Sequence, residues 1–361
     1  MTRSLRLLAL PLLLLAAAAR AETPAPRAPT SPPPIETVAP PPPPVETKTE
    51  TKIVPRPWSP EEKAIHKGSP LAHVPVPDFT ALPAATPVPA PLVGSVRRVE
   101  LPPGEKFVAL TFDLCETSNE VAGYDGAIVD TLRRRGVPAT FFVGGHWAAT
   151  HPERYRELAS DPRFEVENHT WTHANLRTVD DERLAREILA PEAAFRAEGR
   201  TAGSRFLRFP FGACDDRSLK AVNAAGMAAI QWDVSTGDPS PFATARDIVG
   251  DTLAGVRPGS IVLAHANGRG YHTGEALPEI LDRLSAKGYR FVTVGDLLAK
   301  GKPVVTPTCY DSKPGDTDKY DHWTGPGGHK PSKTPLPAAV KPFAPPPAAT
   351  PATPIRQGTT P

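Results

Sequence analysis

The sequence has little cysteine, few aromatic residues and almost no net charge. Only 3 of its 361 residues are cysteine and 7% are aromatic, while 41 Lys and Arg nearly balance 39 Asp and Glu. The basic residues are scattered rather than aligned in a stripe, which argues against a nucleic-acid partner. Apart from one apolar run at residues 7–19, no segment is a candidate for a membrane span. The odd cysteine count allows at most one internal disulfide.

The beginning of the chain has the pattern of a secretory signal. Two arginines precede the apolar run, and Ala-Arg-Ala at 19–21 fits a small-x-small cleavage site. The alternative is a retained membrane anchor, but the run contains Pro11 and is shorter than the ~20 apolar residues that a spanning helix needs. We therefore expect a signal peptide at 1–21 and a periplasmic or secreted protein, whose cysteines meet oxidising conditions.

Proline, in contrast, is abundant and unevenly spread. Of 47 prolines, 21 lie in residues 22–95 and 14 in 301–361, against only 11 in 96–300. Segments such as PPPPPVETKTETK cannot bury enough apolar surface to offset the entropy of an ordered chain. We expect both flanks to be extended, disordered spacers or tails, and the folded domain to be 96–300.

Short apolar runs alternate with helix-like stretches in this domain. Each run has the length and composition of a strand. The runs lie at 107–112, 139–145, 164–168, 205–210, 228–233, 260–265 and 290–294. This alternation predicts parallel βαβ units. Because an eight-stranded barrel typically takes ~250 residues, we predict an α/β fold, a distorted (β/α) barrel of about seven parallel strands. A doubly wound open sheet is the alternative.

Polar side chains follow the ends of these runs. In a parallel barrel the carboxyl ends of all strands lie on one face, where active sites are built. Five separate segments therefore deliver carboxylate, imidazole and guanidinium groups to one rim. The groups belong to Asp113, His169, Arg208, Asp233, Asp238 and His265.

Some of these residue types suit metal-assisted hydrolysis. His169 and His173 form an H-x3-H pair in NHTWTH, and neutral imidazole is a common ligand of zinc and related ions. Two unrelated surface histidines would be the simpler interpretation. Asp113 could be a general base that deprotonates a metal-bound water, or a residue that only caps its loop. Together these residues predict a metal site beside a catalytic carboxylate.

The other polar residues could complete a reaction. Arg208 could pair with the general base and hold it ionised, although a purely structural ion pair has the same pattern. The backbone N–H of Phe211 could stabilise an oxyanion. His265 could protonate a leaving amine, or be a hydrogen-bonded core histidine. Asp233 or Asp238 could orient it, and Asp233 could equally cap a loop.

The segments TFD, HTWTH, RFPF, WDVSTGD and LAH resemble, in order and spacing, the five motifs of the polysaccharide deacetylase family. This is the nodulation-protein-B-type domain of carbohydrate esterase family 4, and the resemblance covers about 105–298. It implies a distorted (β/α) barrel and a hydrolase that uses zinc or another divalent ion. Members remove N-acetyl groups from chitin, peptidoglycan or related glycans, or O-acetyl groups from xylan.

The resemblance implies catalytic roles for the matching residues. Asp113 stands at the general base, Arg208 at the arginine that steadies it, and His265 at the general acid. Phe211 stands where a tyrosine usually supplies the backbone oxyanion donor.

The resemblance also implies binding positions. His169 and His173 match the metal histidines. Leu263 stands at the motif leucine that helps to line the acetyl pocket, and Trp232 of the fourth motif is counted with the substrate-binding residues.

Two motifs depart from the family pattern. The family usually has two adjacent aspartates, base and then metal ligand, and here Leu114 occupies the ligand position. In the fourth motif Ser235 and Asp238 fall at two acid positions and Pro239 at a tryptophan. We predict that Asp238 orients His265.

The missing carboxylate leaves the third metal ligand open, since zinc sites normally have at least three protein ligands. Glu116 could replace it if the loop bends, Asp113 could ligate the ion itself, and Cys115 could bind as a thiolate. For Cys115 we favour a disulfide with Cys214, because both follow motifs at the same rim and the bond would clamp the two loops.

The expected function is a secreted, metal-dependent hydrolase that removes N-acetyl groups from amino-sugar glycans, with zinc as the preferred metal. An O-acetyl esterase on the same scaffold is the nearest alternative. A catalytically weakened glycan-binding protein, without its metal, is the alternative from a different class.

Overall fold

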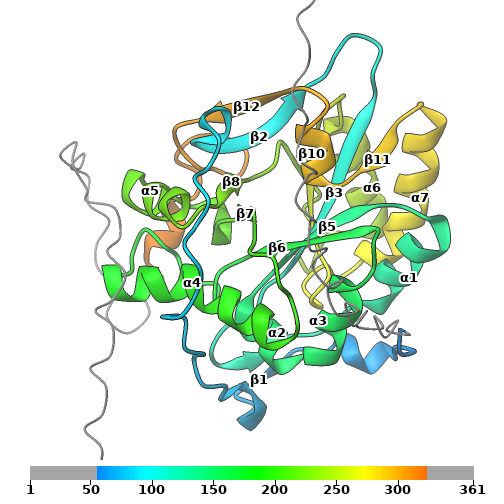
Figure 1. The fold of residues 1–361 in the computed structure, drawn as a ribbon. Helices are drawn as coiled ribbons and strands as arrows, with labels where there is room; N and C mark the ends of the chain where they lie inside the picture. Colours follow the sequence, from blue (N-terminus) through cyan, green and yellow to red (C-terminus); the bar gives the residue numbers. More distant parts are fainter. Residues whose placement is uncertain (1–54, 323–361) are drawn as a thin grey trace, which may run out of the picture. The chain divides into compact units, whose positions relative to one another are not determined.

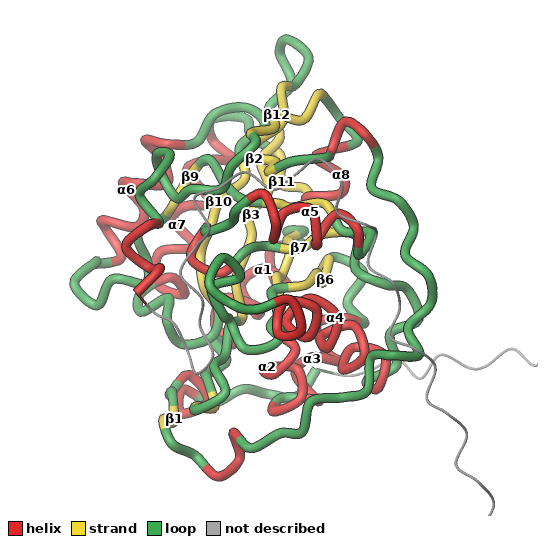
Figure 2. The backbone as a smooth tube through the Cα atoms, turned by 90° about the vertical axis from the view of Figure 1, so that its left-hand side faces the viewer, coloured by secondary structure: helices red, strands yellow, loops and turns green. Residues whose placement is uncertain are grey.

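In the computed structural model, residues 55–322 form a curled, mostly parallel sheet with helices around it (Figures 1 and 2). The predicted signal peptide, the first part of the predicted linker and the chain after residue 322 lie outside the described residues. Within residues 55–322, no helix is long and apolar enough to cross a bilayer.

The main sheet follows the strand order β12-β2-β8-β7-β6-β5-β3-β10-β9, and β11 pairs with the start of β3. Only the β12–β2 pair of these described strands is antiparallel. A bridge between Arg98 and Ser260 brings β2 to the start of β10, so the sheet curls into an incomplete barrel. The strands are β2 (Ser95–Glu100), β3 (Phe107–Leu114), β5 (Ala139–Val143), β6 (Phe164–Asn168), β7 (Phe206–Leu207), β8 (Ala228–Ile230), β9 (Val234–Ser235), β10 (Ile261–His265), β11 (Arg290–Val292) and β12 (Lys302–Thr306).

Helices pack outside the sheet in two series. Contacts run from α6 through α7 to α1, and from α3 through α2 and α4 to α5 (Figure 1). The helices are α1 (Gly126–Arg135), α2 (Gly145–Thr150), α3 (Pro152–Ala159), α4 (Asp181–Ala197), α5 (Asp216–Ala224), α6 (Ala245–Gly255), α7 (Thr273–Ala286) and α8 (Val294–Leu298). A two-stranded sheet, β1 (His66–Lys67) with β4 (Glu120–Val121), lies apart from the main sheet.

The central strand β3 is buried along its whole length, as expected of a parallel strand covered on both faces. Its even-numbered side chains from Val108 to Leu114 join the apolar cluster beneath α1 and α7. The odd-numbered Phe107 and Ala109 join a second cluster, inside the curl of the sheet. Because side chains alternate along a strand, Asp113 faces the same way as this second set.

All seven predicted strand runs contain a strand, and the predicted α/β barrel-type fold is confirmed. The sequence patterns missed β2, β9 and β12. β9 is only two residues long. β2 carries two adjacent arginines, a poor strand signal, and Arg97 is tolerated there because its guanidinium lies 3.8 Å from the centroid of the Tyr310 ring.

Residues 55–94, the N-terminal strap, pack against the barrel, so the prediction of a disordered linker over 22–95 is wrong for this part. Trp58 donates a hydrogen bond from Nε1 to Asp130 at 3.0 Å. Arg154 donates to two backbone carbonyls of the strap, at 2.7 and 3.0 Å. Because proline has no backbone N–H, a proline-rich segment has fewer N–H groups that need an acceptor. Its backbone carbonyls still need donors, and here side chains such as Arg154 supply them. The strap contains three short 3-10 helices, Pro60–Lys63, Pro70–Ala72 and Ala90–Leu92.

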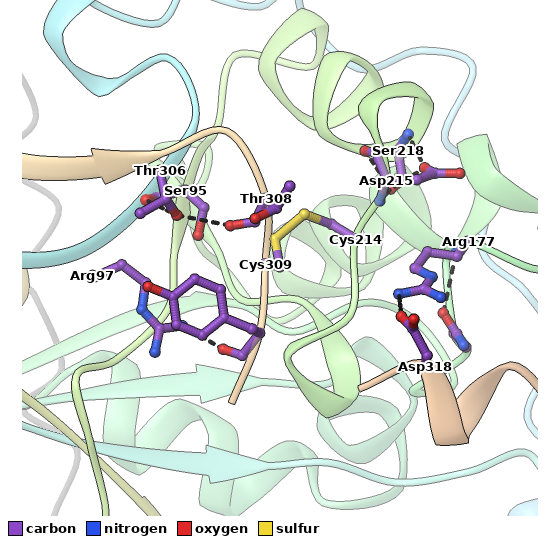
Figure 3. The surroundings of a disulfide bond; sticks show 12 residues. Ser95, Arg97, Arg177, Cys214, Asp215, Ser218, Thr306, Thr308, Cys309 and Asp318 are labelled. Atoms are coloured by element: carbon purple, nitrogen blue, oxygen red, sulfur yellow. Dashed lines mark hydrogen bonds and ion pairs between the residues drawn. A yellow bond between two sulfur atoms is a disulfide. The ribbon is translucent and has the colours of Figure 1, made fainter. Parts of the chain in front are cut away.

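The predicted C-terminal tail is also ordered in its first part. β12 pairs with β2, and a 3-10 helix at Asp318–His322 follows it. Figure 3 shows a disulfide between Cys214 and Cys309, with Arg97 on one side and the ion pair of Arg177 with Asp318 on the other. The prediction of disorder from 301 onward is therefore wrong up to residue 322.

The observed disulfide also corrects the predicted Cys115–Cys214 bond. Cys214 pairs with Cys309, and Cys115 is a free, buried thiol. The sequence predicts the wrong pair because Cys309 lies in the segment predicted to be disordered, where a cysteine has no fixed neighbour.

Replacing Cys309 by serine is expected to lower the free energy of unfolding by about 2–5 kcal/mol. The bond closes a loop across a sequence separation of 95 residues, which restricts the unfolded chain. Denaturant unfolding with and without reductant measures the effect. Reductant should destabilise the wild type and leave the variant unchanged, and equal stability of both oxidised proteins would contradict the bond.

Candidate active site

Two neighbouring strands bring a carboxylate and an imidazole to the same end of the sheet. β3 and β10 pair in parallel, with Asp113 opposite His265. Asp113 is buried and faces away from the apolar cluster that holds Leu114. The structure therefore places these two predicted residues side by side.

Arg208 pairs with Asp113 inside the barrel. Its Nη1 donates to Asp113 Oδ1 at 2.8 Å and to Thr111 Oγ1 at 2.7 Å. Its other N–H groups reach the backbone oxygens of Ile230 and Gln231, at 3.3 and 3.2 Å. Four acceptors fix the plane of this fully buried guanidinium, and the guanidinium in turn fixes the carboxylate.

The two histidines of NHTWTH lie in a loop after β6 rather than on a helix. Thr170 and His173 have positive φ angles of 66° and 54°, a strained conformation that persists only where neighbouring groups hold it. One such contact is the hydrogen bond from the Thr170 N–H to Asn168 Oδ1, at 2.8 Å. The ring centroids of His169 and His173 are 5.0 Å apart, so the loop brings both imidazoles together.

The hydrogen bonds of His169 define its tautomer. Nδ1 lies 2.9 Å from the backbone oxygen of Arg208, which can only accept, so Nδ1 carries the proton of the neutral ring. Nε2 then holds the lone pair. It lies 3.4 Å from Asp113 Oδ2 and is buried with no hydrogen-bond partner among the described residues. Burial lowers the pKa of His169, and lowers that of His173 well below its usual value, which favours rings able to bind a metal.

Cys115 completes a group of three possible metal ligands. Its Sγ and one ring nitrogen from each of His169 and His173 lie within 4.8 Å of one another. Burial raises the pKa of Cys115 to about 12, so without a metal this side chain is a neutral thiol. Catalytic zinc sites have three protein ligands, and imidazole and thiolate are both common in them. The residues present therefore fit a metal ion.

Glu116, the predicted alternative ligand, faces away from the histidine pair. Its Oε1 lies 2.6 Å from His146 Nδ1 and accepts a hydrogen bond from Thr150 at 2.8 Å, while Oε2 accepts from the N–H of Ala122 at 2.7 Å. These contacts occupy the carboxylate beneath α2. The prediction that Glu116 could reach the metal is wrong, because the side chain is needed to satisfy this buried cluster.

Asp238 holds His265 through two contacts. Its Oδ1 lies 2.9 Å from His265 Nδ1, and its Oδ2 accepts from the backbone N–H of His265 at 2.7 Å and from Thr273 at 2.6 Å. Asp233, the other candidate, accepts instead from the backbone N–H of Ile261 at 3.0 Å and caps the turn before β10. Of the two aspartates, the structure brings only Asp238 to the imidazole.

Replacing Asp238 by asparagine is expected to move the basic limb of the kcat/KM profile to lower pH. Burial, the largest single influence, lowers the pKa of His265, and the charge of Arg208 also lowers it. The carboxylates of Asp238 and then Asp113 raise this pKa by more, so the net pKa lies above the ordinary value. A raised pKa keeps a general acid protonated at higher pH, and the variant loses that support. A pH–rate series measures the shift. If the basic limb of the kcat/KM profile does not move and kcat/KM at neutral pH falls less than about 10-fold, Asp238 does not support His265 as the general acid.

Phe211 lies next to His173, one of the two predicted metal ligands. It has a φ of 60°, and its ring centroid is 4.5 Å from that of His173 and 4.9 Å from that of Tyr320. The C-terminal segment therefore reaches the site through Tyr320, a neighbour that the sequence patterns miss because the composition of this segment predicts a disordered tail.

The two predicted substrate-binding residues differ in surroundings. Leu263 is buried in the cluster inside the curl of the sheet, two positions before His265 on β10. Trp232 is also buried, and its Nε1 donates to Asp311 at 2.9 Å. The C-terminal segment thus packs against Trp232, and its contact with substrate stays a prediction.

Asn267 is a site residue that the sequence patterns missed. Its Nδ2 donates to Cys115 Sγ at 3.0 Å and to the backbone oxygen of Cys115 at 2.5 Å. Asn267 follows His265 by two residues. Side chains two positions apart in extended chain point to the same side, so this spacing could have indicated Asn267 from the sequence.

Comparison with known proteins agrees with this geometry. The family model for polysaccharide deacetylase matches residues 100–230. A chitooligosaccharide deacetylase of Bradyrhizobium sp. (strain ANU 289) is 37% identical over 172 residues, which covers 48% of this chain and 74% of that protein. The chain belongs to the polysaccharide deacetylase family. The predicted family and the assignment as a polysaccharide-deacetylase enzyme are confirmed. Members of the family are metal-dependent in general, and this chain has a group of residues able to hold a metal ion.

Two solved structures of the family resemble this fold. The Bc1960 peptidoglycan N-acetylglucosamine deacetylase superposes with a TM-score of 0.52 at 28% identity, covering 58% of this chain and 94% of that chain. BA3943, a carbohydrate esterase family 4 pseudoenzyme from Bacillus anthracis, superposes with a TM-score of 0.51 at 25% identity, covering 57% and 69%.

Proposed function

We propose that the protein is a secreted, metal-dependent deacetylase that removes N-acetyl groups from an amino-sugar glycan of the peptidoglycan or chitin type. The observation that carries the proposal is the pairing of Asp113 with His265 across β3 and β10, beside a group of residues able to bind a metal. The relatives named chitooligosaccharide and peptidoglycan N-acetylglucosamine deacetylases support the substrate class. The disulfide supports an oxidising compartment.

A metal ion would supply Lewis-acid polarisation of the acetyl carbonyl and of the attacking water. Asp113, held by the hydrogen bond from Arg208, accepts the proton of that water as the new C–O bond forms. The backbone N–H of Phe211 donates to the carbonyl oxygen as negative charge develops on it. His265 then protonates the sugar nitrogen from Nε2 as the C–N bond breaks, because Nδ1 is held by Asp238. The products are acetate and a free amine, with Leu263 beside the departing methyl group.

Acetate release by the full-length chain tests the proposal. The substrates are N-acetylglucosamine oligomers and peptidoglycan fragments, with added zinc and then with a chelator. The whole chain is needed because the strap and residues 302–322 belong to the fold. Release that the chelator abolishes supports the proposal, and release that survives complete metal removal overturns its mechanism.

The alternative of a glycan-binding protein without activity is favoured by one observation, the leucine at the usual ligand position. It predicts glycan binding without acetate release when metal is present. The O-acetyl esterase alternative predicts release from acetylated xylan and none from N-acetylated substrates. The same assay with the three substrates therefore separates the three functions.

A further inference from the structure

We propose that the thiolate of Cys115 is the third metal ligand, so that sulfur takes the place of the carboxylate that Leu114 removes. The inference deepens the proposed function, on which it rests for the role of the metal, but it can be tested without any assay of activity. It concerns one residue, and two independent observations support it.

The first observation is the direction of the side chains along β3. Leu114 is fully buried in the apolar cluster beneath α1 and α7, and its backbone pairs with Val143 of β5. A carboxylate at this position would be buried among apolar side chains, at a high cost in desolvation. Cys115 follows the strand, and its Sγ lies within 4.8 Å of nitrogens of both histidines. The ligand has therefore moved one position along the chain, to the side that faces the histidines.

The second observation is the unsatisfied nitrogen of His169. Because Nδ1 is protonated and bound to the Arg208 carbonyl, Nε2 is an acceptor, and neither Cys115 nor any other described residue donates to it. Buried acceptors are almost always satisfied in native proteins. A hydrogen bond from the far side of an imidazole to a backbone oxygen is the usual support for a metal-binding histidine.

The surroundings of Cys115 suit a thiolate. The other two cysteines form the disulfide, so this sulfur is available. The amide of Asn267 donates to Sγ at 3.0 Å, and the Asn267 side chain is itself fully buried. Such a donor stabilises charge on a ligating sulfur and fixes its direction, as outer contacts do in other metal sites.

The ligand set determines the class of metal. A thiolate keeps the single negative charge of the missing aspartate, but sulfur with two imidazoles selects zinc and similar ions over magnesium, calcium or manganese. Zinc with bonds of about 2.0 Å to nitrogen and 2.3 Å to sulfur places tetrahedral ligand atoms about 3.3–3.6 Å apart. The atoms of the group, which lie within 4.8 Å of one another, must therefore approach by no more than about 1.5 Å around the ion. The fourth position stays free for water or substrate.

Cobalt titration of the metal-free full-length protein tests the inference. Co²⁺ bound by a thiolate gives an intense near-ultraviolet charge-transfer band, which imidazole and carboxylate ligands do not give. We expect the band in the wild type with one equivalent of Co²⁺ and its loss in Cys115→Ser. Competition with a chromogenic chelator should show zinc affinity reduced by about 100-fold or more in this variant.

Two further variants make the result specific. Cys115→Asp should bind one equivalent of Co²⁺ without the band, because it restores a carboxylate ligand. Glu116→Gln should keep both the band and the stoichiometry. Circular dichroism and thermal melting check that each protein is folded.

The outcomes separate this inference from the proposed function. Wild-type protein that binds Co²⁺ without the band, or that binds none, would overturn the thiolate ligand, even if acetate release is sensitive to chelator. The band in the wild type and its absence in folded Cys115→Ser would establish the ligand, even if no acetylated glycan is hydrolysed.

Discussion

Replacement of Asp113 by asparagine is expected to lower kcat/KM for acetate release by about 10³-fold. The carboxylate accepts a proton from the attacking water, and general base catalysis typically contributes 10²–10⁴-fold. Asparagine has nearly the same shape and can still accept the hydrogen bond from Arg208, so binding of the glycan should change little. The loss should therefore appear in kcat rather than in KM. Steady-state kinetics on an N-acetylglucosamine oligomer measures both parameters.

Asp233→Asn is the matched control for this variant. Both aspartates lie at or just after the carboxyl end of a strand, but Asp233 accepts from the Ile261 N–H, Ser260 and Arg257 and caps a turn. Its substitution should change kcat/KM by less than about 3-fold, as for residues that do not touch the reaction. Equal losses in both variants would mean that a folding defect, and not a lost base, explains the Asp113 result.

Seven strands were predictable because each lies in a short apolar run between turn or helix signals. β3 is the clearest case, since every residue from Phe107 to Leu114 is buried. The polar residues at the strand ends were predictable for the same reason: parallel strands in one sheet share a carboxyl edge. This argument places Asp113 and His265 on the same rim, and the structure adds that β3 and β10 are neighbours.

The strap could not be predicted from composition. Proline content is averaged over a long segment, whereas the packing of this segment depends on single anchors such as Trp58 and on donors such as Arg154, far away in sequence. The wrong disulfide has the same origin. A disordered tail over 301–361 would leave Cys214 with no partner other than Cys115.

The choice of Cys115 as the proposed third ligand depends on the direction of the side chains. Motif position alone favoured a residue that the loop could bend into place, such as Glu116. Alternation along β3 is the better guide, because it turns Asp113 and Leu114 to opposite sides, and Cys115, just past the strand, continues the pattern toward the histidines. The contacts of Glu116 with His146 could not be read from sequence, since they depend on how α2 packs over the loop.

Replacement of Arg208 by methionine is expected to lower the free energy of unfolding by about 3–5 kcal/mol. Both partners of the ion pair are buried, and removing one leaves the buried Asp113 carboxylate without its counterion. Methionine retains contact with the Phe142 ring, whose centroid is 4.0 Å from the guanidinium, so the loss is mainly electrostatic. At roughly 2–4 °C per kcal/mol, the melting temperature should fall by about 10 °C. Calorimetry measures the change.

Two comparisons show whether the buried pair is the cause. Arg135→Met breaks an exposed pair with Asp282 and should cost less than about 1 kcal/mol of unfolding free energy.

The double variant Arg208→Met with Asp113→Leu removes both charges. It should recover much of the stability lost in the single variant, because apolar replacements of a buried ion pair are often neutral or stabilising. It should also be inactive, because the base is gone. Recovery of stability without recovery of activity would show that this pair is retained for the reaction. If the double variant is as unstable as Arg208→Met, the lost hydrogen bonds to Thr111 and the backbone, and not the orphaned carboxylate, dominate the cost.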